Sequence, residues 1–238
     1  MLLRTDSRFV VAASLLALAG CSANTATAIE PLTPGEPHYG HTHEELAGDW
    51  WAWHYGMPQA GNPVLDTTGA DCANGQPDDV FFLAGTYGES VRRTCTLPAG
   101  RPIFFPIVNI NADNGGVPAD MLATEAELTG FVSDSMDAID TLSLEIDGAS
   151  WDTEALRELR VDTRFAYDVP DVHPNIYDRY DVVFSGHVEP AFTDGYWVYL
   201  PPLPAGTHHI AFTASDAGDP ADPMDDWALD VAYDLTVE

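Results

Sequence analysis

The feature that most constrains the fold is an apolar stretch near the middle of the chain, VRRTCTLPAGRPIFFPIVN at residues 91–109. Up to Leu97 it alternates apolar and polar residues, as a strand with one buried face does. Residues 103–108 are apolar throughout, which indicates a fully buried strand. Residues 98–100, Pro-Ala-Gly, predict a turn between the two. We therefore expect a hairpin in the core of the domain.

Two helices are predicted, each opened by the Thr-x-x-Glu pattern of a capping box. Thr42 opens a helix that runs to about Tyr55, and Thr124 opens one that runs to about Asp140. In both segments apolar residues recur at helical spacing, which gives each helix one buried face. The residues expected on these faces are Leu46, Trp50 and Trp53 in the first helix and Leu128, Phe131, Val132, Ser135 and Ile139 in the second.

The rest of the domain is predicted to be short strands joined by turns. Asp147-Gly148 predicts a tight hairpin, and residues 152–180 are expected to be irregular apart from a short helical piece at 154–159. Further strands are expected at residues 79–84, 181–189, 195–200, 206–214 and 227–237. This pattern favours a mainly β domain, a β-sandwich or jelly-roll-like fold with two added α-helices; an α+β fold is the alternative.

The N-terminus is typical of a bacterial export signal. Arg4 and Arg8 precede an uncharged run at residues 9–20, which is too short to span a bilayer as a helix, since a span needs about 20 apolar residues. Leu-Ala-Gly then precedes Cys21 and resembles the lipobox, whose cysteine is acylated in lipoproteins. A signal peptide cleaved nearby, with Cys21 left as a free thiol, is the alternative.

The residues that follow Cys21 indicate where the protein is held. Ser22 stands where an aspartate retains some lipoproteins at the inner membrane, so the outer membrane or cell surface is favoured. Residues 21–40 are rich in Thr, Ala, Pro and Gly and are predicted to be a flexible tether. Residues 41–238 are expected to form a single domain.

Two further cysteines, Cys72 and Cys95, are an even pair in a chain expected to reach an oxidising compartment, and a disulfide between them is predicted. It would tie the loop at residues 71–75 to the first strand of the hairpin and stabilise the fold by about 3 kcal/mol. A metal or redox pair is the alternative, although C-x-x-C spacing and a neighbouring histidine are missing.

The charge of the chain limits its partners. The sequence has 9 basic residues, none of them lysine, and 38 acidic ones, for a net charge of -29. Such a chain repels phosphate, so nucleic acid is excluded as a partner and anionic lipid headgroups are disfavoured. Adaptation to a saline habitat accounts for such a composition. Binding of hard cations by pairs of carboxylates is a second interpretation.

The ordered motifs of the chain resemble those of an uncharacterised family of bacterial secreted proteins and lipoproteins. The shared segments are the WWAW helix at residues 50–53, Asn-Pro at 62–63 with 66–69, FLAG at 82–85, RTCT at 93–96 through Phe-Pro at 105–106, Asp-Gly at 147–148, and the strands at 195–200 and 206–208. The resemblance implies a single secreted domain with Cys72 and Cys95 paired. It implies no activity and no catalytic residue.

Calcium is the candidate cofactor, and the first candidate site follows the core strand. Asn109, Asn111 and Asp113 offer oxygen ligands at alternate positions, and Asp120 lies near the end of a 12-residue window, as in a calcium loop. Asn114, however, stands where an EF-hand has glycine, and no helix precedes the segment. A plain polar loop is the alternative.

The second candidate cation site is an acidic Pro/Gly loop near the C-terminus. Asp216, Asp219 and Asp222 recur every third residue and are followed by Asp225 and Asp226. A cation would relieve the repulsion among these carboxylates. A solvated acidic loop is the alternative.

Histidines provide an alternative metal site. His187 and Glu189 share one face of a predicted strand, and His209 on a later strand would complete the two-histidine, one-carboxylate set that suits a transition metal. Surface histidines without a metal are the alternative. A second candidate group lies beside the tether: His38, His41 and His43.

Aromatic residues are candidates for ligand binding. Trp51 and Tyr55 in the first helix, and Trp197 and Tyr199 on one face of a strand, could stack against sugar rings, which have flat apolar faces. The same residue types fill cores, so packing of the helix on a sheet is the alternative.

No nucleophile elbow, P-loop or dinucleotide-binding fingerprint occurs in the sequence. The favoured interpretation is a lipid-anchored extracytoplasmic protein that binds a glycan, a small molecule or an envelope partner, with calcium as a candidate structural ion. A secreted hydrolase or lyase that uses a metal or a carboxylate pair is one alternative. A purely structural envelope lipoprotein is the other.

Overall fold

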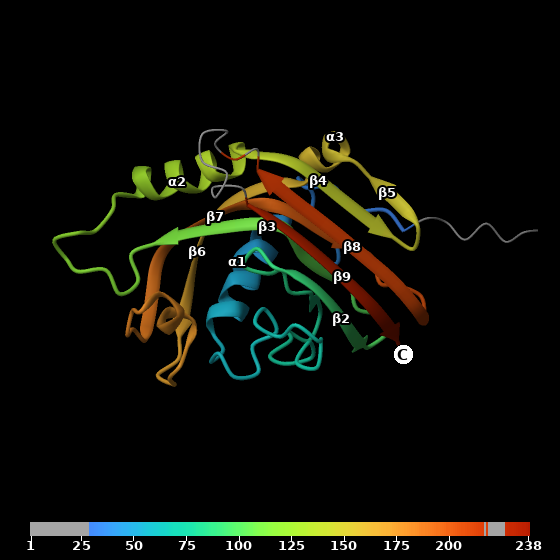
Figure 1. Cartoon of the computed structure of the whole chain (residues 1–238), viewed down its shortest axis with the longest axis horizontal. Helices are drawn as coiled ribbons and strands as arrows, with labels where there is room; N and C mark the ends of the chain where they lie inside the picture. The colour runs from blue at the N-terminus through green and yellow to red at the C-terminus, as the bar shows by residue number, and fades with distance from the viewer. Residues whose placement is uncertain (1–28, 217, 219–226) are drawn as a thin grey trace, which may run out of the picture.

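The fold is a sandwich of two β-sheets with added helices, as predicted (Figure 1). A computed structural model describes residues 29–216, 218 and 227–238. The four-stranded sheet consists, in spatial order, of β1 (Phe81–Phe82), β3 (Ile103–Asp113), β7 (Gly186–Leu200) and β6 (Arg160–Val169). The five-stranded sheet consists of β2 (Ser90–Leu97), β9 (Ala228–Val237), β8 (Gly206–Asp216), β4 (Ile139–Ile146) and β5 (Ala149–Trp151).

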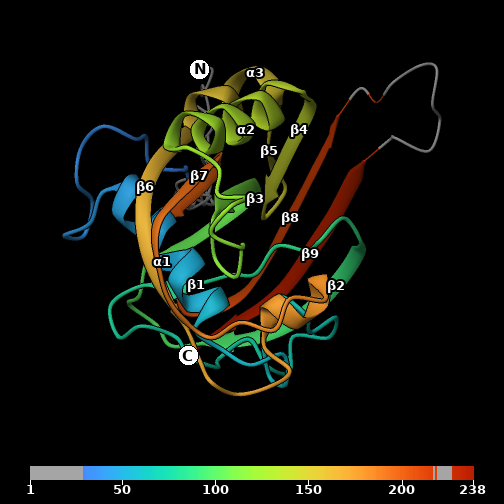
Figure 2. The same cartoon turned by 90° about the vertical axis from the view of Figure 1, so that its left-hand side faces the viewer.

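Helices cover the four-stranded sheet and one end of the sandwich. α1 (His43–Tyr55) packs on β6 and β7, and α2 (Glu125–Asp137) lies next to β7, β3 and β4 (Figure 2). The short helical segments are α3 (Thr153–Leu156), η1 (Arg157–Leu159) and η2 (Ile176–Tyr180). None of the helices in the described ranges is long and apolar enough to cross a membrane.

The main core lies between the sheets, because each strand there turns every second side chain inward. β2 shows this alternation along its whole length, with Val91, Arg93, Cys95 and Leu97 buried and the residues between them exposed. A second core, rich in aromatic residues, fills the space between α1 and the other face of the four-stranded sheet. The four-stranded sheet is thus buried on both faces, as the apolar run in β3 indicates.

The predicted central hairpin is wrong. β2 pairs in parallel with β9 over eight residue pairs, whereas β3 pairs with β1 and β7 in the other sheet. Residues 98–102 therefore carry the chain from one sheet to the other, and the apolar faces of β2 and β3 meet across the core instead of lying side by side. A short Pro/Gly linker is compatible with either arrangement, and the choice depends on β9, which is far away in the sequence.

Both predicted helices exist, and both capping boxes are formed. In α1 the hydroxyl of Thr42 accepts from the Glu45 amide, and Thr124 and Glu127 repeat the pattern in α2. α2 ends at Asp137, however, and its buried side chains are Leu128, Val132 and Met136. Phe131 is 55% exposed, Ser135 is half-buried, and Ile139 belongs to β4, so the face expected for this helix was partly wrong.

Several predicted strands differ from the observed ones. The Asp147-Gly148 hairpin between β4 and β5 is confirmed, with positive φ at both residues, as a tight hairpin turn needs. β1 is only two residues long. β6 lies inside the segment expected to be irregular. The strands expected at 181–189 and 195–200 are one strand, β7, which starts at Gly186 and continues through Pro190.

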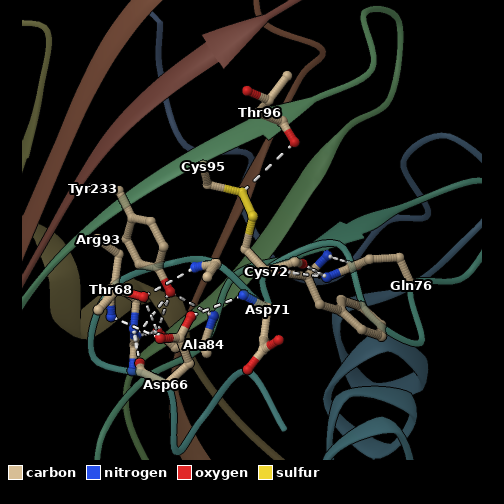
Figure 3. The surroundings of a disulfide bond; sticks show 12 residues. Asp66, Thr68, Asp71, Cys72, Gln76, Ala84, Arg93, Cys95, Thr96 and Tyr233 are labelled. Atoms are coloured by element: carbon tan, nitrogen blue, oxygen red, sulfur yellow. Dashed lines mark hydrogen bonds between the residues drawn. A yellow bond between two sulfur atoms is a disulfide. The ribbon is translucent and has the colours of Figure 1, made fainter. Parts of the chain in front are cut away.

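A disulfide joins Cys72 to Cys95, as predicted (Figure 3). Beside it, the Arg93 guanidinium is buried and donates hydrogen bonds to the Tyr233 hydroxyl and to loop carbonyls. The carbonyls belong to Val64, Asp66, Ala84 and Gly85. The loop that follows α1 is therefore attached to β2 at two adjacent points, which fixes the loop residues that contribute to the site described next.

Candidate functional site

A cleft of about 770 Å³ opens where α1, α2, β3 and the ends of β8 and β9 come together. One wall is formed by the last two turns of α1, and the opposite wall by α2 and the start of β4. Six consecutive residues of β3, 108–113, form the floor. The other lining residues are Trp50, Trp51, His54, Tyr55, Val64, Gly85, Thr86, Tyr87, Phe131, Ser135, Met136, Ile139, Tyr180, Asp216 and Trp227.

The α1 wall is a stack of aromatic rings whose positions are fixed by hydrogen bonds. Trp51 stacks on Tyr55 with 5.7 Å between ring centroids, and Tyr55 stacks on Tyr167 at 4.5 Å. The Trp51 indole N–H donates to Thr193 Oγ1 at 2.8 Å, and the Tyr55 hydroxyl donates to Asn111 Oδ1 at 3.1 Å. Rings held at both the face and the polar tip present a rigid surface to a ligand.

The floor of the cleft is polar because Asn109, Asn111 and Asp113 alternate along β3 and so share the face toward α1. Asp113 accepts four hydrogen bonds. Its Oδ1 accepts from the Tyr177 hydroxyl and the Gly115 amide, and its Oδ2 accepts from the Tyr167 hydroxyl and Asn111 Nδ2. Burial raises the pKa of both tyrosines, so they remain neutral donors.

His54, in the cleft wall, has a hydrogen-bond partner at each of its ring nitrogens. Its Nδ1 lies 3.3 Å from Asn62 Oδ1 and its Nε2 lies 2.7 Å from the Tyr87 hydroxyl. Because an amide oxygen only accepts, we assign the proton to Nδ1, which leaves Nε2 to accept from Tyr87. Burial lowers the pKa of His54 to about 4, against the smaller raising effect of the hydrogen bond that it donates to Asn62. His54 is therefore neutral at pH 7.

Two buried donors beside the floor lack a partner among the described residues. They are Asn109 Nδ2 and the indole nitrogen of Trp197. Both flank Gly195: a Cβ placed there would lie 2.8 Å from Asn109 Cβ and 2.9 Å from Trp197 Nε1. Buried donors are almost always hydrogen-bonded. We therefore expect a ligand atom or a water molecule to accept hydrogen bonds from these two donors.

The predicted calcium loop is wrong in its geometry. Asn109, Asn111 and Asp113 lie within a strand, and the oxygens of Asn111 and Asp113 already accept hydrogen bonds from protein donors. Asp120 is exposed in the loop that follows. Across the described ranges, no group of three or more His, Cys, Asp or Glu side chains is placed to hold a metal ion.

The acidic loop near the C-terminus is only partly described. Asp216 ends β8, lines the cleft, and accepts from the Trp227 amide at 3.0 Å. Asp219 and Asp222, with Asp225 and Asp226, lie outside the described residues. The cation site predicted there stays a prediction.

The alternative histidine site is not assembled. His187 Nε2 lies 3.6 Å from Glu189 on β7, and its Nδ1 lies 2.9 Å from Asp168. His209 is on β8 in the other sheet, where its Nδ1 lies 3.0 Å from Asp234. Each histidine therefore has its own carboxylate partner on a neighbouring strand.

The histidines beside the tether also have separate partners. His38 Nε2 lies 3.0 Å from the Thr33 carbonyl oxygen and His41 Nε2 lies 2.7 Å from Asp79. His43 is buried in α1, and its Nε2 lies 3.1 Å from the Leu32 carbonyl oxygen. Three rings with three different partners do not form a chelating group.

The aromatic candidates are divided by the structure. Trp197 and Tyr199 are fully buried between the four-stranded sheet and α1, so the predicted stacking platform on this strand is wrong. Trp51 and Tyr55 line the cleft, although each is largely buried. Their role in binding a ligand stays a prediction.

Sequence reasoning missed His54, Asn62 and Tyr87. His54 follows the tryptophan run and lies four residues after Trp50, so its helical position indicated burial. A buried histidine calls for hydrogen-bond partners. Asn62-Pro63 instead looked like turn residues, and nothing local links Tyr87 to a helix 33 residues earlier.

Comparisons with known proteins give no family. No family model matches the chain, and no curated protein matches it at a significant level. The solved "Structure of PbICP-C in complex with falcipain-2" aligns over 68% of this chain and 100% of that chain, with 12% identity and a TM-score of 0.23. The "Solution Structure of Amebosin" aligns over 63% and 97%, with 9% identity and a TM-score of 0.18. Similarity this low carries no argument about fold or function.

Proposed function

We propose that this protein is a lipid-anchored extracytoplasmic binding protein that holds its ligand in the cleft between α1 and α2. The observation that supports this most strongly is the cleft itself. It combines rigid aromatic rings with a polar floor, the usual composition of a ligand site. Its volume, about 770 Å³, is that of a site for a small molecule or a few units of an oligomer.

The charge of the lining indicates what kind of ligand fits. The described residues that line the cleft include Asp113 and Asp216 but no lysine or arginine, and His54 is neutral at pH 7 because burial holds its pKa at about 4. An anionic ligand would have no positive partner among the described lining residues and would meet a chain of net charge -29. Arg179 lies behind that lining, with its guanidinium 4.5 Å from the centroid of the Tyr87 ring. A neutral or cationic ligand is favoured.

The anchor is proposed from the sequence. Cys21 at the end of the export signal would receive the lipid, and the residues that follow it would link the lipid to the domain. The predicted tether at residues 21–40 is wrong in its second half, because the Leu32 amide donates to the Tyr199 carbonyl and the Tyr199 hydroxyl donates to the His38 carbonyl. Each buried acyl methylene adds about 0.8 kcal/mol of membrane affinity. Radiolabelled palmitate should enter the protein when it is made in bacteria, and Cys21→Ser should abolish the label. Labelling of the variant would contradict the anchor.

A hydrolase or lyase has weaker support. The histidine–carboxylate set is not assembled, and both oxygens of Asp113, one of two carboxylates among the described residues that line the cleft, already accept two hydrogen bonds each. A carboxylate used in this way positions tyrosines and is poorly placed to act as an acid or base. A purely structural role leaves the open cleft without a purpose.

Binding is tested with a matched pair of tryptophan variants. Trp227 and Trp151 are both partly buried against the core between the sheets, but only Trp227 lines the cleft. Neutral pentasaccharides of glucose and of N-acetylglucosamine, and the peptide described below, are titrated into the purified protein. For any probe that binds, Trp227→Ala should weaken binding at least about tenfold and Trp151→Ala should not, as for loss of one aromatic contact. A binding function for the cleft would be contradicted if both substitutions weakened binding equally, or if neither the saccharides nor the peptide bound.

A further inference from the structure

The floor of the cleft is the free edge of a β-strand. β1 pairs with β3 only at Ile103 and Phe104. Beyond Phe104, β3 has β7 on one side and, among the described residues, no strand on the other. Side chains of successive strand residues point to opposite faces. A cleft lined by all six residues 108–113 must therefore run along the backbone edge itself.

The strand register shows which backbone groups face the cleft. The Phe104 carbonyl accepts from the Leu83 amide at 3.1 Å, so the polar groups of Phe104 face β1 and those of Phe105 face β7. The β-bulge between Pro106 and Val108 shifts this alternation by one residue.

After the bulge, Val108, Ile110 and Ala112 bond to β7. The Ile110 carbonyl also accepts from Thr193 Oγ1 of β7 at 2.7 Å, which places it on that side. The backbone N–H and C=O groups of Asn109 and Asn111 consequently face the cleft, unpaired by any strand among the described residues.

We propose that the ligand of the cleft is an extended, basic peptide segment of a partner protein, which adds to the free edge of β3 as a further strand. Strand addition satisfies an exposed sheet edge by main-chain hydrogen bonds. The aromatic rings of Trp51 and Tyr55 and the rim carboxylate Asp216 would flank alternate side chains of the peptide. This inference rests on the proposed binding function, for which it names the ligand class.

Charge and size support this occupant. Exposed edges are often protected by lysine or by a covering element. This chain has no lysine, and the open part of β3 carries neutral amides and Asp113, whose oxygens accept from protein donors. A basic peptide gains from the net charge of -29 during encounter. At about 3.4 Å per residue, residues 108–113 match a ligand strand of about six residues.

The test uses a pair of synthetic peptides. The probe is fluorescein-labelled Thr-Lys-Val-Lys-Thr-Lys-Val with blocked ends, and its control has the same sequence with every backbone nitrogen methylated. Both carry the same charge, but the control cannot complete a strand ladder. Fluorescence anisotropy at about 0.15 M salt should show the probe binding at least about tenfold more tightly, since each lost main-chain hydrogen bond is worth about 1 kcal/mol.

A matched pair of proline variants locates the binding. Asn109→Pro removes an N–H that faces the cleft, whereas Asp162→Pro removes an outward N–H on β6, the other edge of the same sheet. Proline is tolerated where the N–H of an edge strand is unpaired. Asn109→Pro should weaken binding about tenfold, and Asp162→Pro should leave it unchanged. If Asn109→Pro does not fold, amide hydrogen exchange of the unaltered protein replaces it. Bound probe should then slow exchange at Asn109 and Asn111.

The alternative outcomes are distinct. Equal affinity for the two peptides would mean attraction by charge alone and would overturn strand addition. Binding of a pentasaccharide but not of the probe would overturn the peptide ligand while leaving the binding function intact. If the protein forms concentration-dependent dimers that Asn109→Pro abolishes, a second copy of the chain occupies the edge. That result would also overturn the proposed peptide ligand.

Discussion

The two main helices are alike in sequence signals and differ in how they pack. α1 and α2 each have 13 residues and a complete Thr-x-x-Glu capping box. Nine residues of α1 are buried, whereas only three of α2 are. α1 therefore forms part of the core and one wall of the cleft, while α2 covers one end of the sandwich and supplies the opposite wall. Caps determine where a helix begins, and the surrounding sheets determine how deeply it is buried.

The largest expected contrast is between the big apolar side chains of the two helices. Trp50 is 2% exposed, and its indole N–H donates to the Leu83 carbonyl. Trp50→Ala should lower the free energy of unfolding by about 3–5 kcal/mol, through the cavity and the unpaired carbonyl. Phe131→Ala, at a 55% exposed site, should change it by less than about 0.5 kcal/mol. Urea denaturation measures both, and similar losses would show that α2 is as much a part of the core as α1.

The next contrast concerns pH. Burial lowers the pKa of His54 in α1 to about 4, against about 6.5 in the unfolded chain. The unfolded state thus binds a proton that the folded state does not as pH falls through 6.5 toward 4, so stability is lost on acidification. Linkage gives a loss of about 2 kcal/mol between pH 7 and pH 5 from His54 alone.

The contribution of His54 is isolated by substitution. α2 contains no histidine, so the control is Gly48→Ala, which crowds α1 against Phe165 of β6 without removing a titratable group. His54→Gln should be less stable than the unaltered protein at pH 7, and the difference should shrink by about 2 kcal/mol at pH 5. Gly48→Ala should cost the same at both pH values. A pH-independent penalty for His54→Gln would mean that His54 is not held neutral in the fold.

The same comparison shows what sequence can predict. The starts of α1 and α2 and the turn at Asp147-Gly148 depend on neighbouring residues, and all three were predicted correctly. The partners of β2 and β3 were not, because β9 and β7 lie more than 70 residues away and the linker fits either arrangement. β6 was missed because Arg160, Asp162 and Arg164, on its face away from α1, conceal the apolar residues that it turns toward α1.

The cleft was harder to predict than the fold. Trp51 and Tyr55 could be proposed from an aromatic helix, since residue type alone indicates their chemistry. The role of Asp113 as a hydrogen-bond acceptor for two tyrosines could not be predicted, because Tyr167 and Tyr177 lie 54 and 64 residues away in the sequence. The segment was interpreted as a loop with oxygen ligands, whereas those same oxygens are hydrogen-bond acceptors within a strand.

A Gly→Ala substitution should change the free energy of unfolding in opposite directions in the two helices, and by less than the substitutions above. Gly48 lets α1 approach β6 closely, since a Cβ there would lie 2.9 Å from Phe165 Cβ, whereas nothing lies within 4 Å of one at Gly130 in α2. Gly48→Ala should cost about 1–3 kcal/mol by overpacking. Gly130→Ala should stabilise by about 0.5–1 kcal/mol, because alanine is the better helix former. Thermal unfolding distinguishes them, and stabilisation by both would mean that α1 is not tightly docked on β6.

The smallest contrast should come from the capping boxes, the feature that the helices share. Thr42→Ala and Thr124→Ala each remove a hydroxyl that accepts from the third amide of the helix, which costs about 0.5–2 kcal/mol when unfolding is global. Fraying of the first turn limits that cost where the helix is held by few core contacts. Thr124→Ala should therefore lie near the lower end of the range and raise amide exchange only around residues 125–128. Thr42→Ala should lie near the upper end, because His43, Leu46 and Ala47 are buried directly behind the cap. The two variants would contradict this if urea denaturation gave equal losses in the free energy of unfolding and amide exchange rose equally at both helix N-termini. Burial behind the cap would then not affect how much the cap stabilises the fold.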